Sequence, residues 1–113
     1  MGAQNQSETQ FPAEARPHPR FKLQTDIRVY PHSADVLKGH TVDISESGIS
    51  AMLKPEVSTG EAVQLEFALP SGPVAIRAVV QNKIAFRYGF QFVEPDPQGV
   101  IKAACSYLAA LQR

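Results

Sequence analysis

At 113 residues the chain is long enough for one domain with a modest core, and its 11 basic and 11 acidic residues give a formal net charge of zero. Zero net charge argues against a general binder of nucleic-acid polymers, because such proteins need a strongly basic face. The single cysteine, Cys105, excludes an internal disulfide. No apolar run approaches the roughly 20 residues that cross a bilayer. Since residues 1–15 also lack signal-peptide order, we expect a cytoplasmic protein without membrane insertion.

Residues 1–15 form a polar segment rich in Gln, Ser, Asn, Ala and Glu, with almost no apolar side chains. Such a segment cannot bury enough surface to offset the entropy lost on ordering. We therefore predict a flexible N-terminal tail over residues 1–15, and one ordered domain over residues 16–113.

Alternation of apolar and polar residues predicts six or seven short strands after this tail. Turn-forming residues separate the alternating segments, and an additional break is expected at Arg87-Tyr88-Gly89. The predicted strands cover residues 21–29, 36–42, 49–53, 63–69, 74–80 and 84–92.

The C-terminal end changes to a helical period. Asp96 is a suitable N-cap and Pro97 is a favoured first residue, so a helix is predicted over about residues 97–112. Its apolar face carries Val100, Ile101, Ala104, Leu108 and Leu111, and Cys105 is expected to pack at the edge of that face. The predicted fold class is all-β with a terminal helix: a six- to seven-stranded antiparallel β-barrel capped by a C-terminal α-helix.

Two arginines lie four residues apart in the segment Arg16-Pro17-His18-Pro19-Arg20. The prolines hold this segment extended, because each fixes its own φ and disfavours helix in the residue before it. A guanidinium group is a planar, permanently charged fork that matches phosphate oxygens and the acceptor edge of guanine. We name residues 16–20 the strap and predict that it can close on a phosphorylated ligand. Two solvated arginines beside a tail are the plainer alternative.

The segment Asp43-Ile44-Ser45-Glu46-Ser47-Gly48 is predicted to connect two strands as a hairpin turn. Asp and Ser oxygens bond nearby backbone N–H groups and Gly permits positive φ, so these residues can simply shape the turn. The alternative is that the same groups face a ligand. A carboxylate accepts the N–H groups of a guanine edge, and a hydroxyl donates or accepts. With the strap, the segment indicates a site for a molecule carrying both phosphates and guanine.

An arginine pair with three residues between, followed one strand pair later by Asp-x-Ser-x-x-Gly, resembles the PilZ family. That family consists of small bacterial β-barrels, of the split-barrel type, with a C-terminal helix that bind cyclic di-GMP. The resemblance covers the chain from roughly Arg16 to its C-terminus. It implies that Arg16 and Arg20 hold phosphate and guanine Hoogsteen atoms, that Asp43 and Ser45 contact guanine, and that Gly48 lets the turn fit.

The resemblance also implies a receptor without catalysis, whose strap changes conformation on ligand binding and which signals to an unidentified protein effector. A monomer or weak dimer is expected. Many family members carry another arginine directly before the pair, where this chain has Ala15. This difference leaves open whether one ligand molecule binds or an intercalated pair. Motility, exopolysaccharide synthesis and pilus assembly are all outputs that the resemblance implies, and the residues do not choose among them.

The residues also bear on four alternatives. A nucleotide-independent PilZ-like adaptor is the main one, and the intact motifs count against it. An oligonucleotide-binding barrel is not expected, because the net charge is zero and no strand is expected to carry a pair of exposed aromatic residues. An enzyme is not expected, because the glycine-x-serine-x-glycine elbow is missing. A metal site is not expected either, because the three histidines lack partners at ligand spacing. The only small-molecule partner predicted is cyclic di-GMP. Arg77 and Arg87 are further candidates to flank its site, but their spacing in the sequence does not establish that they do.

Overall fold

The computed structural model describes residues 18–32, 35–54 and 57–112, so the predicted tail and Arg16 lie outside the described residues. Within this part of the chain, strands come first and a single long helix comes last. The elements are β2 (Phe21–Lys22), β3 (Asp26–Pro31), β4 (Leu37–Ile44), β5 (Gly48–Met52), β6 (Ala62–Leu69), β7 (Gly72–Ile84), β8 (Arg87–Phe92), the 3-10 helix η2 (Pro97–Gly99) and α1 (Val100–Leu111).

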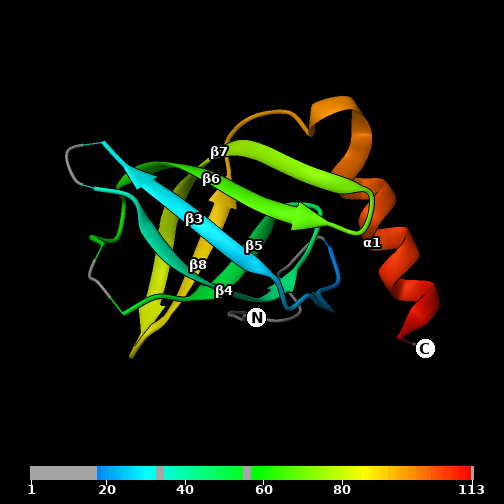
Figure 1. The fold of residues 1–113 in the computed structure, drawn as a ribbon, viewed down its shortest axis with the longest axis horizontal. Helices are drawn as coiled ribbons and strands as arrows, with labels where there is room; N and C mark the ends of the chain where they lie inside the picture. The colour runs from blue at the N-terminus through cyan, green and yellow to red at the C-terminus, as the bar shows by residue number, and fades with distance from the viewer. Residues whose placement is uncertain (1–17, 33–34, 55–56, 113) are drawn as a thin grey trace, which may run out of the picture.

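Six of these strands close into a barrel. They pair antiparallel in the order β4, β3, β6, β7, β8, β5, and β5 pairs back onto β4. The short strand β2 adds to the end of β4, and α1 lies against one end of the barrel (Figure 1). Because the barrel is closed, each of the six strands has a hydrogen-bonded neighbour on both edges. A small closed sheet of this kind therefore needs no further element to cover an edge strand. The predicted fold class is confirmed.

Inward-facing side chains from the strands fill the barrel. In β6 the apolar residues Val63, Leu65, Phe67 and Leu69 are all buried, and the residues between them face outward or are half-buried. The Phe67 ring stacks on that of Phe92, with 6.3 Å between the ring centroids. This period-two burial confirms the strand predicted over residues 63–69.

The prediction of one strand over residues 21–29 is wrong at its middle, where regular strand pairing is interrupted between β2 and β3. Buried Thr41 of β4 occupies this gap. Its hydroxyl accepts the Thr25 N–H at 2.9 Å and donates to the Leu23 carbonyl. A side chain thus takes the backbone groups that a continuous strand would pair with its neighbour. The partner lies 16 residues away, beyond the reach of a local pattern.

The break predicted at Arg87-Tyr88-Gly89 is also wrong, because β8 runs through it. The turn between β7 and β8 lies at Ala85 and Phe86, and Ala85 takes the left-handed conformation with φ 55°. As a result β7 extends to Ile84, and the hairpin end projects from the barrel (Figure 1). Ile84 and Phe86 are 77% and 56% exposed, so their alternation does not place them in the core.

The C-terminal helix begins at Val100, three residues after the predicted start, because Gln98 and Gly99 have φ of 55° and 71°. Asp96 still serves the helix. Its carboxylate accepts the backbone N–H groups of Ile101 and Lys102, each at 2.8 Å, and so satisfies two donors that the first turn leaves unpaired. Asp96 thus bonds the first turn as predicted for a capping residue, but the N-cap position of α1 is Gly99, three residues later.

One face of α1 packs on the barrel through Ile101, Ala104, Cys105 and Leu108, as the apolar pattern predicts. Leu111 is 63% exposed, contrary to the prediction, and it lies in the last turn of the helix. Burial, reinforced by the carboxylates of Glu46 and Asp96, raises the pKa of the Cys105 thiol to about 11. Cys105 is therefore a packing residue with a neutral thiol.

Candidate functional site

A β-bulge in β4 sets the direction of Asp43. Thr41 and Asp43 pair with consecutive residues of β5, so Val42 is an extra residue in β4. Thr41 and Ile44 both point into the barrel, 3% and 0% exposed, although regular alternation would place residues three apart on opposite faces. The bulge therefore turns Asp43 outward beside Ser50. Asp43, which was predicted to lie in the hairpin turn, lies in β4 itself.

A register shift in β7 extends this arrangement across the barrel. Asn82 of β7 pairs with Gly89 of β8, which in turn pairs with Ser50 of β5 and so continues the row from Asp43. The Asn82 side chain lies over Gly89, since a Cβ at Gly89 would meet Asn82 Oδ1 at 2.6 Å. We name these four residues, Asp43, Ser50, Gly89 and Asn82, the outer row.

The strap ends at Arg20, whose guanidinium lies on the outer row. Its Nε donates to Asp43 Oδ1 at 2.7 Å, its Nη2 lies 2.7 Å from the same oxygen, and Nη2 also donates to Ser50 Oγ at 3.0 Å. The Arg20 and Asp43 side chains are only 22% and 16% exposed, so water screens this pair weakly. The structure thus brings together one arginine of the predicted pair and the carboxylate of the predicted turn.

A second guanidinium holds the other oxygen of the same carboxylate. Arg87 Nη2 donates to Asp43 Oδ2 at 2.8 Å, and the Arg87 side chain is 50% exposed. Asp43 therefore lies between two arginines, one from the strap and one from β8. These three side chains together carry one net positive charge. The sequence spacing left the place of Arg87 open, and the structure places it at the site.

Ser45 shapes the turn between β4 and β5. Its side chain is buried, and its Oγ accepts the backbone N–H groups of Ser47 and Gly48, each at 3.2 Å. The Ser45 N–H donates to the Gly48 carbonyl at 2.8 Å. This geometry matches the turn-shaping alternative of the sequence analysis. The contact of Ser45 with guanine stays a prediction.

Gly48 is required by a close approach of two strands. It pairs with Gln91 of β8, and a Cβ at position 48 would meet the carbonyl oxygen of Phe90 at 2.4 Å. Real Cβ atoms do not come that close to a backbone oxygen, so β5 and β8 would have to separate to admit a side chain.

Next to this turn, His18 Nε2 of the strap lies 3.9 Å from Glu46 Oε1. The strap thus approaches the hairpin at His18 as well as at Arg20.

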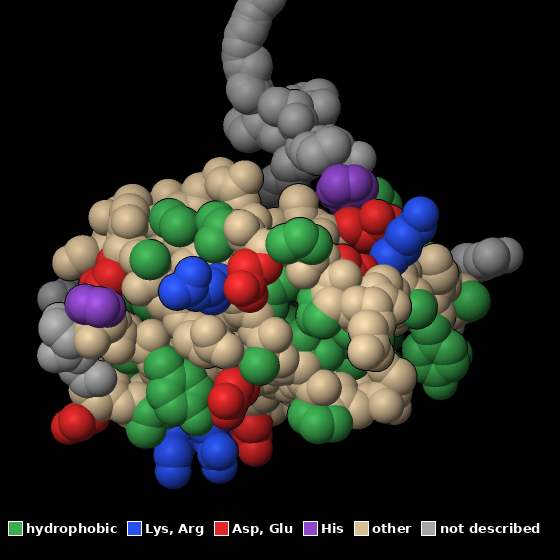
Figure 2. Space-filling model, turned by 90° about the horizontal axis from the view of Figure 1, so that it is seen from above, with side chains coloured by type: hydrophobic (Ala, Val, Ile, Leu, Met, Phe, Trp, Pro, Cys, Tyr) green, Lys and Arg blue, Asp and Glu red, His purple; other side chains and the backbone are tan. Residues whose placement is uncertain are grey.

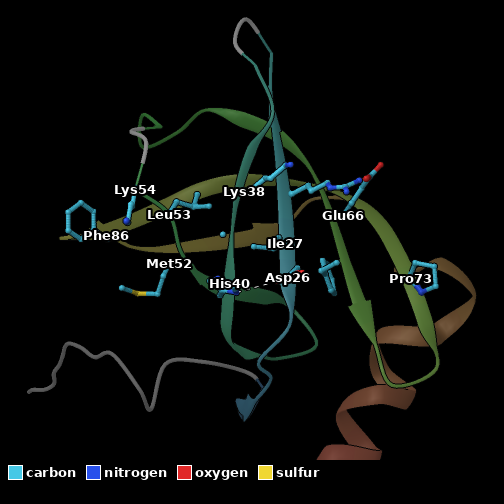
Figure 3. Close-up of a pocket in the computed structure, with 13 residues that line it drawn as sticks. Asp26, Ile27, Lys38, His40, Met52, Leu53, Lys54, Glu66, Pro73 and Phe86 are labelled. Carbon is cyan, nitrogen blue, oxygen red and sulfur yellow. Dashed lines mark ion pairs between the residues drawn. The ribbon is translucent and has the colours of Figure 1, made fainter.

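A concave region of about 920 Å³ lies on another part of the surface, along β3, β4 and β6 and the hairpin end (Figure 3). An ion pair of 3.3 Å joins His40 and Asp26 beside it, but both side chains are mostly exposed, so it adds little stability. None of Arg20, Asp43, Ser45 and Gly48 lines this region. Its lining residues are Asp26, Ile27, Arg28, Lys38, Gly39, His40, Met52, Leu53, Lys54, Glu66, Phe67, Pro73 and Phe86.

Charged side chains of both signs are interspersed over the face in Figure 2, as the zero net charge leads one to expect. Any anion site on this barrel is therefore local. Among residues 18–32, 35–54 and 57–112, no group of three or more His, Cys, Asp or Glu is placed to hold a metal ion. In the same part of the chain, no helix has the length and apolar character needed to span a membrane.

The PilZ domain family profile matches residues 14–106, a range that includes the strap and the whole Asp43–Gly48 segment. The chain belongs to the PilZ domain family. PilZ domains are receptor domains that bind cyclic di-GMP, and they are not enzymes. In this PilZ domain, Arg20 of the strap and Asp43 of the Asp43–Gly48 segment are in contact on the barrel surface.

Solved structures share the fold of this PilZ domain. It is similar to the Bacillus subtilis inhibitor of motility MotI/DgrA, with a TM-score of 0.73 and 20% identity, over 91% of this chain and 56% of that one. It is similar to the PilZ domain of Escherichia coli YcgR with cyclic di-GMP, with a TM-score of 0.68 and 17% identity, over 88% and 92% of the two chains. The K. pneumonia MrkH–cyclic di-GMP complex gives a TM-score of 0.66 and 21% identity, over 85% and 51%. This chain thus spans about half the length of MotI and MrkH. No curated protein matches it.

Sequence reasoning missed Ser50 and the outer row, and it did not settle Arg87. Ser50 reads as one more polar residue in an alternating strand, and Gly89 was taken for a strand break. The two bulges that align these residues depend on which strands pair and in which register. The one signal available was an arginine directly before Tyr88-Gly89 in a largely apolar strand.

Proposed function

We propose that this PilZ domain is a receptor module for cyclic di-GMP. The observation that carries the proposal is the contact of the Arg20 guanidinium with Asp43 and Ser50. It places a strong donor fork next to a carboxylate acceptor on one half-buried patch. A guanine dinucleotide needs both, because its phosphates and Hoogsteen edge accept hydrogen bonds and its Watson–Crick edge donates them. The fold shared with YcgR and MrkH, whose structures contain cyclic di-GMP, adds support.

The residues take distinct roles in this proposal. Arg20, with Arg16 from the part of the strap outside the described residues, binds phosphate and Hoogsteen atoms. Asp43 accepts guanine N–H groups from the barrel surface, and Gly48 keeps the hairpin close to β8. Ser45 fixes the turn and offers its hydroxyl to guanine. With Ala15 before the arginine pair, both one bound ligand and an intercalated pair fit the proposal.

We propose further that the strap changes conformation when the ligand binds and that this change is read by a protein effector in the cytoplasm. The Arg20 and His18 contacts with β4 and its turn support this step, because a ligand that takes over Arg20 must rearrange them. A monomer or weak dimer is sufficient for such a module.

Isothermal titration with cyclic di-GMP tests the proposal. The wild-type chain is expected to give a saturable heat. Arg20→Ala and Asp43→Ala are each expected to weaken binding about tenfold or more, since each removes a charge-assisted hydrogen bond worth roughly 1.5–3 kcal/mol. Arg28→Ala is the matched control, because Arg28 is an exposed arginine of β3 outside the site, and it is expected to bind like wild type. Absence of heat from the wild-type chain would refute the proposal.

Thermal stability separates the receptor from the nucleotide-independent adaptor. A ligand that binds only the folded state at about 100 times its Kd stabilises that state by about 2.7 kcal/mol. A receptor therefore shows a clear rise in Tm with cyclic di-GMP, and an adaptor shows none at any concentration of the nucleotide.

A further inference from the structure

The Asp43 carboxylate is held by two residues that lie far from it in the sequence. Arg20, 23 residues before it, donates to Oδ1, and Arg87, 44 residues after it, donates to Oδ2 at 2.8 Å. A carboxylate offers about four lone-pair sites, so it retains capacity for a donor from outside the protein. The two donors restrict the rotation of the Asp43 carboxylate, and so determine the direction from which its remaining lone pairs can accept a hydrogen bond.

The two arginines are anchored differently. Arg87 belongs to β8, one of the six strands that form the closed barrel, where it pairs with Met52 of β5 and with Ile84 of β7. Arg20 belongs to the strap and precedes the two-residue strand β2. When a ligand engages the Arg20 guanidinium, Arg87 is the partner that keeps Asp43 in place.

Charge gives a second reason for Arg87. Asp43 and Arg20 alone sum to zero, which makes a weak site for an anion. Arg87 raises the sum to one positive charge while its side chain stays 50% exposed. Once a ligand phosphate engages Arg20, Arg87 still neutralises Asp43, so the carboxylate does not repel the ligand phosphates.

We propose that Arg87 is a positioning residue of the binding site: by holding Asp43 Oδ2 it keeps the carboxylate directed at the N–H donors of guanine. This inference rests on the proposed function and adds to it a residue outside both sequence motifs. Arg87 acts through Asp43, so its contribution to binding depends on the presence of that carboxylate.

A double-mutant cycle tests this dependence by titration with cyclic di-GMP. Arg87→Gln, Asp43→Ala and the double variant are compared with the wild-type chain. With Asp43 present, Arg87→Gln is expected to raise Kd about tenfold, or about 1.4 kcal/mol. With Asp43 already replaced by alanine, it is expected to change Kd by less than about twofold. Arg28→Gln removes the same charge from an exposed position on β3 outside the site and is expected to leave Kd unchanged in both backgrounds.

Each other outcome overturns the inference in a distinguishable way. Equal losses in the two backgrounds would show that Arg87 acts on the ligand without Asp43. Wild-type affinity in Arg87→Gln would remove any role for it while leaving the proposed function intact. No binding by the wild-type chain would refute the proposed function and this inference together. Thermal unfolding without ligand confirms that the variants fold, and Arg87→Ala must reproduce the same coupling.

Discussion

The carbonyl oxygen of Phe90 lies where a side chain at position 48 would begin, 2.4 Å from the ideal Cβ. Gly48→Ala must push β5 away from β8, and overpacking of this kind costs about 1–3 kcal/mol. We expect urea unfolding to show a loss in that range. Gly99→Ala is a comparison that separates the two causes, because nothing lies within 4 Å of its Cβ and only its φ of +71° is strained, at roughly 1–2 kcal/mol. A Gly48→Ala variant as stable as wild type would contradict the contact.

The buried hydroxyl of Ser45 is the acceptor for two backbone N–H groups of the same turn. Ser45→Ala leaves both donors without this partner, and a lost buried hydrogen bond costs about 1–3 kcal/mol. We expect a lower urea midpoint in Ser45→Ala. Ser58→Ala, at an exposed loop position, is expected to unfold like wild type. Equal midpoints for the two variants would show that Ser45 does not stabilise the turn.

Single residues also show how much of the site the sequence could predict. The motifs led us to expect Arg20 near Asp43, and the two side chains are in contact; that both bind the ligand stays a prediction. Arg87 and Ser50 could not be assigned, since their place depends on strand register. A shift of one residue moves a side chain to the opposite face of a sheet, and the bulge at Val42 makes such a shift.

Among the elements, α1 carries a pH-dependent contribution to stability. Burial and nearby carboxylates raise the pKa of the Cys105 thiol from 9.0 to about 11, so the folded state favours the neutral thiol. This contribution is complete below pH 9 and is lost as the pH rises toward 11. We expect the urea midpoint of wild type to fall more steeply over that range than the midpoint of Cys105→Ala. Parallel curves would contradict the shift.

The start of α1 depends on Asp96, whose two carboxylate oxygens accept the N–H groups of Ile101 and Lys102. Asp96→Ala is expected to cost about 0.5–2 kcal/mol of unfolding free energy. Asp35→Ala is a matched control, because Asp35 is an exposed loop carboxylate. Urea unfolding measures both. A loss no greater in Asp96→Ala than in the control would show that the cap contributes nothing.

Element types were predictable and element ends were not. Alternating apolar and polar residues predicted the strands, and one apolar face predicted the helix, because both patterns are local. The ends are set by contacts between elements. Thr41 separates β2 from β3, and the left-handed Gln98 and Gly99 delay the helix behind its capping residue. Such contacts leave no local signal beyond a polar residue or a glycine.

On the scale of the whole molecule, one reciprocal pair of hydrogen bonds joins the strap side of the barrel to the end of α1. The Lys22 N–H donates to Gln112 Oε1 at 2.9 Å, and Gln112 Nε2 donates to the Lys22 carbonyl at 2.8 Å. Lys22 lies two residues after Arg20, so the segment Arg20–Lys22 links the Asp43 contact to the end of the helix. The site and α1 are therefore physically connected.

This connection predicts a ligand effect at a distance. Cyclic di-GMP is expected to slow amide hydrogen exchange in the last turn of α1 in the wild-type chain, because ligand contacts with Arg20 steady β2 and its bonds to Gln112. Gln112→Ala is expected to lose this effect at the helix while its Kd changes by less than about twofold, since Gln112 touches neither Arg20 nor Asp43. Gln64→Ala, at an exposed position on β6, should keep it. If the helix end responds equally in Gln112→Ala, the signal travels by another route, and the tie to β2 is only structural.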